Sequence, residues 1–208
     1  MDVQYFGANC FSISYKGSRI IIDDNLSELG GKSITKAEDV TLSTDGKENN
    51  KGRLNFSAPG EYEVSDIAII GIPARSYMEE ESDNHGSTMF KIMAGDQTLL
   101  ITGHINAELK DSQLENIGII DVMIVPVGGH GYTLDPTGAL SLIKKVEPKI
   151  IIPSHYEDKE LKYPVPQIGL NEALKDLAME PKETVAKYKI KPSDLSDVTQ
   201  LVILEKTK

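Results

Sequence analysis

Histidines follow strand-like apolar runs at three places in this chain, and an imidazole in such a position can bind a metal ion or transfer a proton. They are His104, His130 and His155. The clearest case is the isoleucine run 150–152, which leads through Pro153 to His155; because proline has no N–H to donate, we expect the strand to end there. Open α/β folds bind ligands beyond their strand ends, so the three histidines are candidates for one site. The alternative is that they simply occupy loops.

The composition limits the classes of function that the chain can have. Its 208 residues suit one domain with a substantial core, so we predict a single domain over residues 1–208. Acidic residues outnumber basic ones by 32 to 22, and this balance opposes binding to nucleic acid or to an anionic membrane. Apolar runs fall short of the roughly 18 residues of a membrane span, and the N-terminus lacks the features of a signal peptide.

The single cysteine, Cys10, fits a reducing compartment, so we predict a cytoplasmic protein. Its partner would be a small molecule or another protein, which includes a second copy of the chain.

Short strands with glycine-marked turns dominate the first hundred residues, and helices appear only afterwards. The amphipathic segment 137–146 lies between the buried strands 121–127 and 149–152, which is typical of a βαβ unit. Further helices are expected at 107–116 and 170–178, and further strands at 184–190 and 201–205. The order of elements indicates an α/β fold.

Five segments together resemble the metallo-β-lactamase superfamily. They are YFGANCFSI at 5–13, RIIIDDN at 19–25, APGEYEVSDIAIIGIP at 58–73, IDVMIVPVGGHGYTLDPTGAL at 120–140 and EPKIIIPSHY at 147–156. The chain is most similar to the small cytoplasmic zinc-dependent hydrolase branch that includes ascorbate-6-phosphate lactonase. This resemblance implies a four-layer αββα sandwich with a metal site along one edge, between the two sheets.

The resemblance also implies a set of metal ligands, most of which are replaced. In the family an H-x-H-x-D-H loop, a later histidine, a bridging aspartate and a final histidine hold two metal ions, usually zinc. The corresponding positions of this chain carry Asp45, Lys47, Asn49, Asn50, Ser76, His104 and His155. Of these only His155 is a ligand of the family's type at its own place.

A chain that has lost so many ligands cannot hold a binuclear zinc centre. The main prediction is therefore a pseudoenzyme, a binding or interaction protein without a cofactor. The alternative is a hydrolase with a mononuclear zinc or iron site on Asp45, His104 and His155, with His130 within reach. Its substrate would be a small ester, lactone or phosphorylated metabolite.

Lys47 leaves two further hypotheses open. Its ammonium could take the place of the metal ion by pairing with Asp45 and with nearby acids such as Asp23 or Asp24, since a buried carboxylate needs a partner. Alternatively, Lys47 is simply exposed on a loosened loop.

Overall fold

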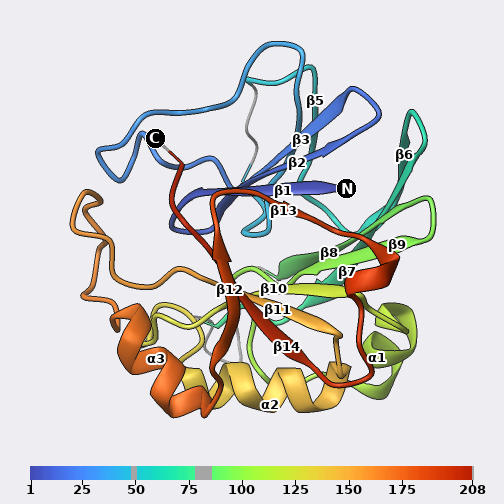
Figure 1. Cartoon of the computed structure of the whole chain (residues 1–208). Coiled ribbons are helices and arrows are strands. Elements are labelled where there is room, and N and C mark those ends of the chain that lie inside the picture. The colour runs from blue at the N-terminus through green and yellow to red at the C-terminus, as the bar shows by residue number, and fades with distance from the viewer. Residues whose placement is uncertain (48–50, 78–85, 208) are drawn as a thin grey trace.

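The strands of the computed structural model, which describes residues 1–47, 51–77 and 86–207, form two sheets that face each other (Figure 1). The first sheet has the order β13-β1-β2-β3-β4-β5. Turns with left-handed backbone at Ala8 and Lys16 connect its antiparallel strands β1, β2 and β3. The bounds are β1 Asp2–Gly7, β2 Cys10–Tyr15, β3 Ser18–Ile22, β4 Val40–Leu42, β5 Leu54–Phe56 and β13 Tyr188–Lys189.

The second sheet has eight strands in the order β12-β14-β11-β10-β9-β8-β7-β6. Its first half along the chain is an antiparallel meander, whereas β9, β10, β11, β14 and β12 run parallel. The bounds are β6 Gly60–Val64, β7 Ile67–Ala74, β8 Ser87–Ala94, β9 Gln97–Ile101, β10 Val122–Pro126, β11 Ile150–Ser154, β12 Pro181–Val185 and β14 Gln200–Leu204. Because parallel strands end at the same edge, the loops after β9, β10 and β11 lie close together.

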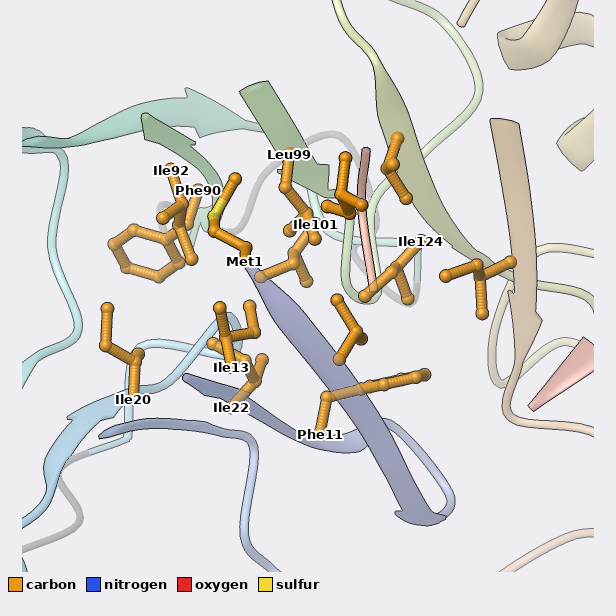
Figure 2. Close-up of a cluster of buried hydrophobic side chains, with 14 of the residues drawn as sticks. Met1, Phe11, Ile13, Ile20, Ile22, Phe90, Ile92, Leu99, Ile101 and Ile124 are labelled. Atoms are coloured by element: carbon orange, nitrogen blue, oxygen red, sulfur yellow. The ribbon is translucent and has the colours of Figure 1, made fainter. Parts of the chain in front are cut away.

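The main core lies between the sheets. Figure 2 shows Phe11, Ile13, Ile20 and Ile22 of the six-stranded sheet below Phe90, Ile92, Leu99, Ile101 and Ile124 of the other sheet. All of these side chains are buried. Alternate residues of β1 point into this core, as the period of two in its burial requires.

Three α-helices cover the outer face of the eight-stranded sheet: α1 Asp111–Ile117, α2 Pro136–Val146 and α3 Leu170–Leu177 (Figure 1). A short 3-10 helix, η1 Pro192–Asp194, precedes β14. The outer face of the six-stranded sheet is covered by Leu26, Leu29 and Leu161, which lie in irregular chain. The predicted α/β sandwich is confirmed, with the difference that in the described residues this outer layer contains no α-helix.

Three expectations about individual elements are wrong. The strand β11 does not stop before Pro153, which pairs with Val125. The reason is that β14 pairs with β11 only at Ile150 and Ile151, so Pro153 has a ladder neighbour on one side only. The expected strand at 184–190 is split, because β12 joins one sheet and β13 the other. The helix expected from residue 107 begins at Asp111.

No helix in the described part of the chain is long and apolar enough to span a membrane.

Candidate functional site

Loops from both sheets meet at one edge of the sandwich. His104 follows β9, and His155 follows β11, whose end is tied to the other sheet by a hydrogen bond from the His155 N–H to the Ala8 carbonyl at 2.8 Å. The loop after β4 approaches the same edge, since the Thr88 N–H donates to the Thr44 carbonyl at 2.9 Å. The strand ends therefore bring together residues that are far apart in the sequence.

The imidazoles of His104 and His155 lie against each other. Their ring centroids are 4.8 Å apart and the rings meet edge to face. The Tyr132 ring lies 5.5 Å from each of them, and the Tyr163 ring lies 5.1 Å from His155. Both ring nitrogens of His104 are buried and have no hydrogen-bond partner in the described residues. This histidine pair is the centre of the candidate site.

Gln167 fixes the orientation of His155. The His155 Nδ1 lies 3.1 Å from the Gln167 Oε1, while the Gln167 Nε2 donates to the carbonyls of Val165 and Pro166 at 3.0 and 3.1 Å. Because those two bonds determine which end of the amide is the nitrogen, the oxygen faces the imidazole and Nδ1 must carry the proton. The Nε2 lone pair of His155 is then available as a metal ligand.

Both imidazoles are neutral at physiological pH. Burial lowers the pKa of His104 to about 3, and the neighbouring His155 and Lys47 act in the same direction. Burial also lowers the pKa of His155 to about 4, although the hydrogen bond with Gln167 opposes this. A metal ion binds neutral imidazole, so both side chains are in the form that can bind one.

His104 lines a pocket of about 420 Å³ that is rich in carboxylates; we call it the acidic pocket. Its acids are Asp23, Asp24, Glu28 and Asp45, and its cations are Lys47 and Lys51. Asp23 accepts hydrogen bonds from the Thr44 N–H, the Thr44 hydroxyl and the Asn9 amide, each at 2.7 Å. Burial raises the pKa of Asp23 to about 7 despite these bonds, so its carboxyl can hold a proton near neutral pH.

Asp45 and Lys47 form an ion pair at the mouth of the acidic pocket. The Lys47 Nζ lies 3.3 Å from the Asp45 Oδ2, and their side chains are 77% and 37% exposed. The charge of Asp45 raises the pKa of the Lys47 ammonium. Lys47 pairs with Asp45, but no ion pair with Asp23 or Asp24 is present in the described residues. Its ammonium is largely exposed, which agrees with the alternative of an exposed Lys47 and not with a buried substitute for the metal ion. In the ranges that the structure describes, no three His, Cys, Asp or Glu side chains converge on a metal position.

The remaining predicted site residues lie around this centre. Ser76 forms an isolated β-bridge with Ile105, directly beside His104. His130 is exposed on the loop after β10 and has left-handed backbone. Asn49 and Asn50 lie outside the described residues.

Three residues in contact with the histidines were not predicted from the sequence: Tyr132, Tyr163 and Gln167. Tyr132 follows the Gly-rich loop that starts at Gly128, so it could have been suspected. Gln167 gives no comparable signal, because it lies in a proline-marked connection twelve residues after His155.

A family model described as the β-lactamase superfamily domain matches residues 2–155, which include the acidic pocket and both histidines. The chain belongs to the metallo-β-lactamase superfamily. A member of known structure from Thermotoga maritima, a candidate zinc-dependent hydrolase, has a TM-score of 0.74 and 24% identity, and the match covers 98% of this chain and 97% of that one. That identity shows likeness of fold alone.

Two curated proteins that are similar in sequence to this chain are named metal-dependent hydrolases. The one from Thermococcus onnurineus is 27% identical over 112 residues, which are 52% of this chain and 50% of that protein. The one from Carboxydothermus hydrogenoformans is 36% identical over 67 residues, which are 32% of this chain and 29% of that protein. The chain thus spans half or less of the length of these relatives.

Proposed function

We propose that this chain is a metal-dependent hydrolase with a mononuclear site at His104 and His155, which acts on a small ester, lactone or phosphorylated metabolite. The observation that carries the proposal is the pair of adjacent neutral imidazoles, of which one has no hydrogen-bond partner in the described residues and the other presents its Nε2 lone pair. The names of the relatives support a metal-dependent reaction.

The side chains that could bind a metal ion here fit one divalent ion better than two. A binuclear centre is disfavoured because Lys47 places an ammonium where the family has a ligand and holds the carboxylate of Asp45. One ion such as zinc could bind to the two imidazoles, with Asp45 as a third donor after release from Lys47. When bound, the ion supplies Lewis-acid chemistry for hydrolysis.

The chain itself supplies the orientation and the surroundings of this site. Gln167 holds His155 in one tautomer, and Tyr132 packs against both imidazoles. Asp23 lines the same pocket with a carboxyl that can hold or release a proton near neutral pH. The site therefore has two buried imidazoles that can bind a metal ion, beside the Asp23 carboxyl, which is suited to proton transfer.

The proposal is tested by the metal content of the protein. After incubation with zinc and dialysis, we expect about one zinc per chain by elemental analysis, and a loss of this zinc in His104→Ala and in His155→Ala. His130→Ala is the matched control, because this histidine is exposed on a neighbouring loop. Zinc-loaded protein should then hydrolyse a neutral ester such as 4-nitrophenyl acetate. Absence of bound zinc in the parent protein would refute the proposal.

A second candidate function is a non-catalytic binding protein that keeps the cleft of the fold. The observation that favours it is that no three acidic, histidine or cysteine side chains of the described ranges converge on a metal position. Ligand binding by a protein that takes up no metal ion would support this function over the first.

A further inference from the structure

Asp24 has a carboxylate whose two oxygens are used very differently. Its Oδ2 accepts four hydrogen bonds, from the Ser33 hydroxyl, the Ile34 N–H, and the N–H and hydroxyl of Thr35, at 2.6 to 2.8 Å. Its Oδ1 is buried and has no partner among the described residues. Asp24 is 7% exposed and lines the acidic pocket, so a charged acceptor there lacks a donor.

This carboxylate is ionised at neutral pH. Burial favours its neutral form, but the hydrogen bonds from Thr35, Ser33 and Ile34 outweigh burial and lower the pKa of Asp24. Another buried acid, Asp39, pairs with Arg19, whose Nη1 lies 3.1 Å from the Asp39 Oδ2. No such cation lies within ion-pair distance of Asp24 in the described part of the chain.

The neighbouring groups add further acceptors and negative charge. The Oδ1 of Asn25, which also lines the pocket, is buried and has no partner in the described residues. Glu28 adds an exposed carboxylate. The two lysines are already engaged, because Lys47 pairs with Asp45 and the Lys51 Nζ donates to the Ser27 hydroxyl at 3.4 Å. The pocket therefore has an excess of acceptors over donors.

We infer that the acidic pocket binds a small molecule that carries a primary ammonium group, which donates to the free oxygens of Asp24 and Asn25. An ammonium group has three donors and a positive charge, and both meet the needs of this pocket. A phosphate or carboxylate group would instead face Asp24, Glu28 and Asp45. The catalytic meaning of this inference rests on the proposed function. Taken with that function, the inference narrows the substrate class to amine-bearing esters and lactones and disfavours phosphorylated metabolites.

Two esters of similar length and opposite charge test the inference. Ethyl 6-aminohexanoate carries an ammonium, and monoethyl adipate carries a carboxylate. We expect saturable binding of the amine by ligand-observed NMR at pH 7 and low salt, at least tenfold tighter than binding of the half-ester. The protein is first treated with a chelator, so that the result does not depend on whether the chain holds a metal ion. Equal binding of the two esters, or no binding of the amine, would overturn the inference.

Variants identify the acceptor. Asp24→Asn removes the charge while its amide oxygen can keep the bonds to Ser33 and Thr35, and it should weaken amine binding at least tenfold. Glu28→Gln changes an exposed carboxylate without risk to folding and should weaken amine binding several-fold, whereas Glu63→Gln, an exposed site on β6, should not. Amine binding that is the same in Asp24→Asn, Glu28→Gln and the parent would also overturn the inference.

Discussion

At the scale of single residues, the candidate site depends on side chains that are neutral because they are buried. His104 and His155 contribute ring nitrogens rather than charge, and their low pKa values follow mainly from loss of solvation. A neutral imidazole has one donor nitrogen and one acceptor nitrogen, so the proton on each ring decides which nitrogen can bind a metal ion. The residue that makes this choice for His155 is Gln167.

Gln167→Leu should lower the zinc affinity of the protein about 10- to 100-fold, because the loss of a partner that orients a ligand has effects of that size. The leucine cannot accept the His155 Nδ1 proton. Gln167→Glu keeps an acceptor for the Nδ1 proton but loses the bonds to the Val165 and Pro166 carbonyls, so it should retain more zinc affinity than Gln167→Leu, as measured by competition with a zinc-binding dye. The ¹⁵N shifts of the His155 ring test the tautomer without any metal. An unchanged tautomer in Gln167→Leu would contradict the role of Gln167.

Lys47→Ala should increase zinc affinity about tenfold, because it removes a cation close to His104 and releases the Asp45 carboxylate. The free energy of unfolding should change by less than about 1 kcal/mol, since an exposed ion pair contributes little. Urea unfolding and zinc titration measure the two effects. Lys16→Ala removes another exposed ion pair, with Asp66, and is the control. A large loss of stability in Lys47→Ala would instead indicate that the ammonium takes the structural place of a metal ion.

At the scale of elements, the site is made by the ends of parallel strands. The sequence predicts this part well, because the apolar run before His155 reflects burial on both faces of β11. It could not predict that Gln167 orients this histidine, and it could not decide whether Lys47 is buried or exposed, since both depend on the path of irregular chain. The irregular cover of the six-stranded sheet was also missed, because the family resemblance implied helices there.

Gly128 lies in the loop after β10. Because it has no side chain, the loop after β11 and the connection that carries Gln167 can both pack closely against it. A Cβ at this position would lie 2.0 Å from the His155 carbonyl oxygen and 2.1 Å from the Gln167 Oε1. Gly128→Ala should therefore destabilise the protein by about 3 kcal/mol and lower zinc affinity, since neither atom can move without breaking the site. Urea unfolding and zinc titration measure both effects.

The control is Gly131→Ala in the same loop. A Cβ there would meet no atom within 4 Å, so only its left-handed backbone, with φ at +76°, should cost about 1 kcal/mol. Equal effects of the two substitutions would show that close packing at Gly128 does not hold the site together.

At the scale of the whole molecule, the two sheets enclose one apolar core, and the polar groups buried at its edge make stability depend on pH (Figure 2). His104 and His155 have lower pKa values folded than the usual 6.5, so they stabilise the fold above that pH and lose this contribution as the pH falls towards 4. Asp23 has the opposite sign. Its pKa rises from 3.8 to about 7 on folding, so its contribution is present in acid and is lost as the pH rises to 7.

Between about pH 4.5 and 5.5 these three groups partly cancel. The unfolded chain binds about two more protons at the histidines, and the folded chain binds about one more at Asp23, so the three together make stability rise with pH with a net slope of about one proton, or about 1.4 kcal/mol per pH unit. Asp23→Asn removes the opposing group. The free energy of unfolding of the variant minus that of the parent should therefore increase by about 1.4 kcal/mol per pH unit over this range and level off above pH 7.

Urea unfolding of the chelator-treated proteins from pH 4.5 to 8 measures this difference. The many other carboxylates titrate alike in both proteins and cancel, and any loss of packing or of the Asn9 hydrogen bond in Asp23→Asn adds an offset that does not vary with pH. Only the slope is diagnostic. Parallel stability curves for the two proteins would mean that Asp23 is ionised throughout the range, and it could not then hold the proton that the proposed hydrolase assigns to it.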